Sequence, residues 1–167
     1  MLAKPPLAQR KMTLNILWVA MLGAIGIYWT IKILVLARAP ASTQDAGFLV
    51  LPLVVLSTLL YGLAWWWFHT VVGGVSQRLT PTAVAQLSGG ERGALGDKLQ
   101  AAILVCLALL ETPVVFGLIS AFVRNPQPLF ESAVITSLLG MGWLRLTGYP
   151  KVFSLLDRLE PAPSTSH

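Results

Sequence analysis

The amino-acid sequence predicts an all-α integral membrane protein with four transmembrane helices, arranged as two hairpins and followed by a short C-terminal amphipathic helix. Of its 167 residues, 55% are hydrophobic and 11% are charged, whereas soluble domains carry about 25% charged residues. The hydrophobic residues form four runs separated by polar segments, and each run is long enough to cross a bilayer as a helix. We therefore expect a single membrane domain in contact with lipid, and no soluble domain with its own core.

The first predicted span covers residues 13–37, behind a cytoplasmic N-terminal segment of residues 1–12. No charge interrupts this span before Lys32, which we interpret as an anchor whose amine reaches the membrane surface. Residues 37–39 (Ala-Arg-Ala) resemble the cleavage site of a signal peptide. Because the apolar core of a signal peptide has only about 7 to 15 residues, we predict that the span is retained.

The second predicted span covers residues 47–72 and follows a short loop. Three tryptophans and a histidine occur toward its end: Trp65, Trp66, Trp67 and His69. Aromatic side chains with a polar N–H collect at membrane–water interfaces, where the ring lies among acyl chains and the N–H among headgroups. We interpret these four residues as interfacial anchors.

Residues 73–98 form the longest polar segment, which we expect to be a cytoplasmic loop. Thr80 before Pro81 is a typical N-cap and first-turn pair, so a short helix should run to about Leu87. Residues 87–91 (Leu-Ser-Gly-Gly-Glu) match the ABC-transporter signature. That signature acts only beside a Gly-x-x-x-x-Gly-Lys-Ser/Thr loop, which this sequence lacks, so we interpret the match as an ordinary loop.

The third and fourth predicted spans cover residues 99–123 and 129–147, with a proline-bearing turn between them. Tyr149 and Pro150 should end the fourth span. Residues 148–167 should then form a cytoplasmic tail that begins as an amphipathic helix on the membrane surface and ends in a disordered segment. The apolar positions of that helix are Val152, Phe153, Leu155, Leu156 and Leu159.

Lysine and arginine residues predict the orientation of the spans. Four spans place both termini on one side, and that side carries nine of the twelve Lys and Arg residues: three in the N-terminal segment, three in residues 73–98 and three after residue 144. The positive-inside rule therefore predicts cytoplasmic N- and C-termini. The basic residues form no stripe with interleaved aromatics, so nucleic acid is not an expected partner.

The residue most suggestive of function is Glu111, the central residue of the third predicted span. An ionisable group near the bilayer midplane is costly and marks a candidate functional site, and we expect it to be protonated there. A face of small residues, which should pack against other helices, lies roughly opposite Glu111: Ala102, Cys106, Pro113, Gly117 and Ser120. Counting along the second and fourth spans places candidate polar partners at a similar depth, in one layer: Ser57, Thr58, Tyr61, Thr136 and Ser137.

Pro113 offers a structural explanation for the same cluster. A proline has no N–H and kinks a helix, so the carbonyl of Leu109 loses its usual helical donor. The hydroxyl of Thr112, or a protonated Glu111, can donate to nearby freed backbone. On this interpretation the polar groups serve the helix and not a ligand.

Residues 108–119 (Ala-Leu-Leu-Glu-Thr-Pro-Val-Val-Phe-Gly-Leu-Ile) resemble the carboxylate helix of ATP synthase c subunits, in which an Ala-Leu-x-Glu element is followed by an aromatic residue, glycine and leucine. In that family the glutamate binds the transported proton or sodium ion. The resemblance implies this role for Glu111, and the adjacent Thr112 completes our candidate ion site. A structural carboxyl and an ion-binding carboxyl both remain open.

Few residues are available for catalysis or metal binding. The sequence has one cysteine, Cys106, and two histidines, His69 and His167, so no metal cluster, disulfide, Ser-His-Asp or Cys-His arrangement can be assembled. We expect no enzyme activity, metal or cofactor. The leading hypothesis is a non-enzymatic subunit or oligomer component of a membrane complex, whose partners are other membrane subunits or further copies of the chain. The alternative is proton or cation translocation through Glu111 in a c-subunit-like assembly.

Overall fold

The computed structural model describes residues 7–36, 50–122 and 128–160, and all regular structure within these residues is helical. In chain order the elements are α1 (Leu7–Leu36), α2 (Val50–Arg78), α3 (Pro81–Gln86), α4 (Gly89–Phe122), α5 (Pro128–Trp143), the π-helical turn η2 (Leu144–Gly148) and α6 (Tyr149–Leu159). Four continuous helices are long and apolar enough to cross a membrane, and the fourth is the run from α5 through α6. The chain is therefore an all-α, multi-pass membrane protein, as the hydropathy predicts.

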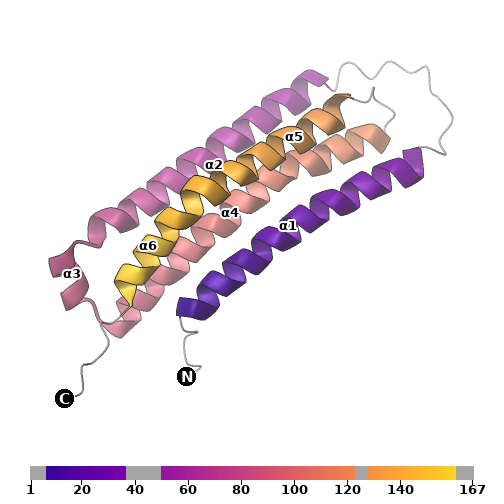
Figure 1. The fold of residues 1–167 in the computed structure, drawn as a ribbon. Coiled ribbons are helices and arrows are strands. Elements are labelled where there is room, and N and C mark those ends of the chain that lie inside the picture. The colour runs from indigo at the N-terminus through magenta and orange to yellow at the C-terminus, as the bar shows by residue number, and fades with distance from the viewer. Residues whose placement is uncertain (1–6, 37–49, 123–127, 161–167) are drawn as a thin grey trace.

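Helix α4 is the centre of the bundle. It contacts α1, α2, α5 and α6, and Figure 1 shows α1 on one side of it and α2 on the other. Half of the most apolar window of α4 is buried by other helices, compared with 6% of that window in α1 and 11% in α2. The core therefore follows α4, while α1 and α2 present most of their apolar surface outward.

The spans alternate in direction, so the start of α1 and the end of α6 lie at the same end of the bundle (Figure 1). At this end the Lys11 amine pairs with the Asp157 carboxylate at 2.5 Å. The Tyr149 hydroxyl donates to the backbone oxygen of Leu14 at 2.9 Å. We call this the basic end, because Arg78 and Lys98 lie there too, at the end of α2 and near the start of α4.

The structure does not confirm the first of the two predicted hairpins. Helix α1 packs against α4 and α6, whereas α2 packs against α4 and α5. Residues 37–49 connect the two helices, and 13 residues can reach about 40 Å, which permits α2 to run on the far side of α4. Both α1 and α2 thus pack against α4.

The helices extend beyond the predicted membrane spans at the basic end. Helix α1 begins at Leu7, six residues before the predicted span, and its charged first turns have partners: Arg10 pairs with Asp97 at 2.8 Å, and Lys11 pairs with Asp157. Helix α2 continues past residue 72 to Arg78. Residues 1–6, 37–49, 123–127 and 161–167, which include the predicted disordered tail and the proline turn, lie outside the described residues.

Most of the predicted loop of residues 73–98 is helical, and its position on the cytoplasmic side of the membrane stays a prediction. The short helix within it is confirmed as α3: Thr80 is its N-cap, and its hydroxyl accepts from the backbone N–H of Ala83 at 3.4 Å. Helix α4 then begins at Gly89. Its start is a capping box, in which Ser88 N–H donates to Glu91 Oε2 at 2.9 Å and Glu91 N–H donates to Ser88 Oγ at 3.3 Å.

The fourth span does not end at Tyr149 and Pro150. A proline cannot donate to the carbonyl four residues earlier, and the chain accommodates this with the wider turn η2, in which Tyr149 N–H bonds to the oxygen of Leu144. The predicted amphipathic helix exists as α6, but it continues the span. Its apolar residues Val152, Leu155, Leu156 and Leu159 are buried, because α6 packs on α4 and α1. Its location on the membrane surface stays a prediction.

Candidate functional site

Glu111 lies on α4 and is partly buried. Its Oε1 accepts a hydrogen bond of 2.9 Å from the hydroxyl of Tyr28 on α1. The opposite face of small residues is buried as predicted: Ala102, Cys106, Pro113, Gly117 and Ser120. The Glu111 carboxyl therefore points away from the most tightly packed face of α4, and on that side it contacts Tyr28 of α1.

Tyr28 is the site residue that the sequence reasoning missed. A signal for it existed, because Tyr28 lies only three residues from the middle of the first predicted span, residues 13–37. Counting depth in that span, as in the second and fourth, would have placed its hydroxyl near the level of Glu111.

The neighbouring polar groups of α4 serve the backbone. The Thr112 hydroxyl donates to the oxygen of Ala108 at 2.7 Å, one residue before the carbonyl that Pro113 deprives of a donor. The fully buried Ser137 of α5 donates to the oxygen of Leu110 at 2.6 Å. Hydroxyl donors therefore occupy carbonyls on either side of Leu109.

The five predicted polar partners of Glu111 lie on another side of α4. Tyr61 on α2 places its hydroxyl 3.0 Å from Thr136 Oγ1 and 3.0 Å from Ser137 Oγ on α5. Thr58 donates to the oxygen of Val54 in its own helix at 2.8 Å. The predicted single layer is thus split by α4 into a Tyr28–Glu111 contact and a hydroxyl cluster between α2 and α5.

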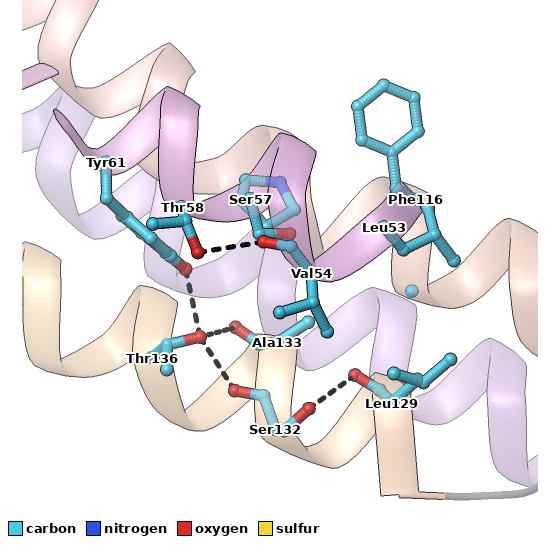
Figure 2. A pocket seen from close by; sticks show the side chains of 12 residues that line it. Leu53, Val54, Ser57, Thr58, Tyr61, Phe116, Leu129, Ser132, Ala133 and Thr136 are labelled. Atoms are coloured by element: carbon cyan, nitrogen blue, oxygen red, sulfur yellow. Dashed lines mark hydrogen bonds between the residues drawn. The ribbon is translucent and has the colours of Figure 1, made fainter. Parts of the chain in front are cut away.

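The hydroxyl cluster lies in a groove between α2 and α5, which we call the α2–α5 groove. Two adjoining cavities of about 310 Å³ and 550 Å³ form it, and both are lined by Thr58, Tyr61 and Thr136. Figure 2 shows the first cavity, with Tyr61 and Thr58 on α2 facing Thr136 and Ser132 on α5. Ser57 and Pro113 also line it.

Charged residues near the ends of the spans tie α1 to the rest of the bundle. Lys32 forms an ion pair with Glu131 and lies over the rings of Trp29 and Phe130. Arg145 donates to Asn15 Oδ1 at 2.6 Å and stacks over the ring of Trp18. Lys32 therefore joins α1 to α5, because its charge is paired with Glu131 within the protein.

The predicted interfacial anchors lie on α2, which continues beyond them to Arg78. Trp65, Trp66 and His69 are exposed, whereas Trp67 is partly buried. The His69 ring lies 4.6 Å from that of Trp65. Trp65 also lines the α2–α5 groove beside Cys106 and Leu110, and the interfacial role of the four residues stays a prediction.

Within the described ranges, His, Cys, Asp and Glu side chains form no group of three or more that could hold a metal ion. Cys106 is buried and donates to the oxygen of Ala64 at 3.3 Å. Its thiol thus acts as a packing contact between α4 and α2.

Comparisons with family models, curated proteins and solved structures found no match to this chain. The local resemblance to ATP synthase c subunits therefore stays a prediction. The function has to be argued from the helices and their contacts.

Proposed function

We propose that this chain is a non-enzymatic component of a membrane assembly, and that it acts by packing the α2–α5 groove against a helix of a partner subunit or of a second copy. The observation that carries this proposal is the groove itself. It is open at the side of the bundle, since Thr58, Gly62, Thr136 and Leu139 along it are exposed.

The residues along the groove are of the kind that favour association of helices in membranes. Small and hydroxyl-bearing side chains let backbones approach closely and can bond across an interface. Gly62 and Ala133 supply small side chains, and Ser132 and Thr136 supply hydroxyls. Lipid tails cannot replace such hydrogen bonds, so a partner helix is a better occupant than acyl chains.

Gly62 offers a direct test, because a Cβ added there would meet nothing within 4 Å. Gly62→Leu should therefore fill the groove without a clash inside the chain. Gly142→Leu is the matched control, since Gly142 also has nothing within 4 Å and does not line the groove.

The measurement is the mass and composition of the complex extracted from native membranes in mild detergent. We expect the wild type and Gly142→Leu to run as an assembly, and Gly62→Leu to run as the single chain. A wild type that is strictly monomeric and has no companion protein would refute the proposal. An assembly that survives Gly62→Leu would refute the groove as its contact.

We propose proton or cation binding at Glu111 as a second candidate function, because the Tyr28–Glu111 contact supports it. No basic side chain among the described residues pairs with Glu111, whose recorded partner is the neutral hydroxyl of Tyr28. An acid of this kind can exchange a proton or bind a cation without first breaking an ion pair. The resemblance to c subunits motivates the same role.

Labelling with a hydrophobic carbodiimide tests this second candidate, because the reagent modifies protonated carboxyl groups within membranes. We expect Glu111 to be labelled in native membranes, Na⁺ or high pH to protect it, and Glu111→Gln to abolish the label at this position. Absence of labelling in the wild type would argue against an accessible ion-binding acid.

A further inference from the structure

We propose that a second groove, between α2 and α4 at the basic end, binds the phosphate of an anionic membrane phospholipid. This α2–α4 groove has a volume of about 320 Å³, and its lining includes Arg78, Lys98, Gly74 and Ala101. It shares no lining residue with the α2–α5 groove. The site is therefore independent of the proposed assembly contact.

The rim of the α2–α4 groove carries two positive charges. Arg78 ends α2, Lys98 lies near the start of α4, and both side chains are exposed. In the part of the chain that the structure describes, no ion pair is recorded for either of them. The acid next to Lys98 in the sequence, Asp97, is 2.8 Å from Arg10, so Arg78 and Lys98 remain available to an anion.

Most of the remaining lining of the groove is apolar. Val71 and Val75 of α2 and Leu95 and Ala101 of α4 line it. Lys98 immediately precedes the apolar run of residues 99–123, so the rim lies where the helix passes from headgroups to acyl chains. The groove thus combines cations at headgroup level with an apolar lining.

This combination matches an amphiphile better than a small anion. Basic pockets between membrane helices bind anionic headgroups, and charge-assisted hydrogen bonds to phosphate oxygens are among the stronger contacts that Arg and Lys make. A free phosphate would use the rim alone, whereas a phospholipid also covers Val71 and Ala101.

The test is lipid binding to the purified full-length protein in mild detergent, followed by native mass spectrometry. The probes are phosphatidylglycerol, phosphatidylcholine, inorganic phosphate and glycerol 3-phosphate. We expect phosphatidylglycerol to bind at least tenfold more tightly than phosphatidylcholine, and the two water-soluble phosphates not to displace it. Equal binding of both lipids, or displacement by either soluble phosphate at the concentration of the lipid, would overturn the proposal.

Removing the two charges tests the rim. Each charge should contribute about fivefold to the affinity for phosphatidylglycerol. The double variant Arg78→Gln, Lys98→Gln should therefore weaken binding about 25-fold. The double variant Lys151→Gln, Arg158→Gln removes the same charge from exposed side chains of α6 at the same end. It should change binding less than twofold, and an equal loss in both variants would show diffuse attraction in place of a site.

Two adjacent glycines give a test that changes no charge. A Cβ at Gly74 or at Gly73 would meet nothing within 4 Å, so both positions should tolerate leucine. Only Gly74 lines the groove. We expect Gly74→Leu to reduce phosphatidylglycerol binding at least tenfold and Gly73→Leu to leave it unchanged, and unchanged binding in Gly74→Leu would overturn the proposed site.

Discussion

Tyr28 of α1 and Glu111 of α4 are joined by a hydrogen bond of 2.9 Å within the membrane-spanning part of the bundle. This contact is notable because α1 is only weakly covered by the rest of the chain: 6% of its most apolar window is buried. With so little packing, each polar contact contributes a larger share of what holds α1 against α4.

A double-mutant cycle on Tyr28→Phe and Glu111→Leu should therefore give a favourable coupling. Hydrogen bonds between membrane helices contribute about 0.6 kcal/mol on average and up to about 1.7 kcal/mol. We expect a value in the upper half of that range, measured by unfolding in mixed detergent. Glu111→Gln is the control: its amide oxygen still accepts from Tyr28, so Tyr28→Phe should remain destabilising in that background. A coupling of zero would mean that the contact does not hold α1.

Gly96→Ala should destabilise the basic end. A Cβ at Gly96 would lie 2.6 Å from Arg10 Nη1 and 3.3 Å from Arg10 Cζ. Arg10 is only 5% exposed, so its guanidinium cannot move aside easily. Nη1 lies 2.8 Å from Asp97 Oδ1 but makes no well-directed hydrogen bond, and displacing it would weaken a contact that is already imperfect. Overpacking of this kind costs about 1 to 3 kcal/mol.

Gly73→Ala should instead increase the free energy of unfolding, which makes it a useful comparison. A Cβ at Gly73 meets nothing within 4 Å, so the substitution should stabilise α2 by about 0.5 to 1 kcal/mol through helix propensity alone. Thermal unfolding of both variants in one detergent checks the pair. Stabilisation by Gly96→Ala would show that Arg10 has room to move.

The capping box at the start of α4 gives a prediction about pH. A helix of 34 residues is about 51 Å long, well beyond the hydrocarbon thickness of about 30 Å. Glu91, in its first turn and ahead of the apolar run 99–123, therefore lies outside the membrane. Hydrogen bonds from the Ser88 backbone N–H and hydroxyl lower the pKa of Glu91.

A carboxyl whose pKa is lowered by folding stabilises the folded state above its unfolded pKa, about 4.3 for glutamate, and loses that contribution as pH falls through the lower, folded pKa. Wild type should therefore exceed Glu91→Ala in unfolding temperature at pH 7, and the difference should shrink in acid. Ser88→Ala should cost about 1 kcal/mol at pH 7. A difference that does not vary with pH would mean that the charge of Glu91 has no part in the cap.

The capping box also gives residues 87–91 a structural role at the start of α4. The match to a transporter signature is explained by helix chemistry, since Ser88 and Glu91 have the Ser-x-x-Glu spacing of a capping box. Hydrophobicity alone did not reveal it, because the first turns of α4 are polar. The four spans follow from apolar runs, and the buried face of α4 follows from the spacing of its small residues.

Apolar runs do not reveal where charged residues extend a helix beyond the predicted span. Arg10 and Lys11 lie in α1 and pair with Asp97 and Asp157, and both acids are far away in the sequence. The partner of Glu111 was missed for a similar reason. Periodicity places a residue on a helix face, but it does not say that α1, and not α2, covers that face.

Ser137 should be the most sensitive hydroxyl of the cluster between α2 and α5. It is fully buried, donates to the oxygen of Leu110 at 2.6 Å and lies 3.0 Å from the hydroxyl of Tyr61. It therefore joins α5 to both α4 and α2.

Ser137→Ala removes both contacts and leaves the Tyr61 hydroxyl with Thr136 alone, so we expect a loss of about 1 kcal/mol in the free energy of unfolding. Ser132→Ala is the matched control on the same helix. Ser132 is exposed, and its recorded hydrogen bond goes to the oxygen of Leu129 in the first turn of the same helix, at 3.0 Å, so its loss should cost less than about 0.5 kcal/mol. Equal effects of the two substitutions would mean that the contacts of Ser137 across the helices stabilise the protein no more than the bond of Ser132 within its own helix.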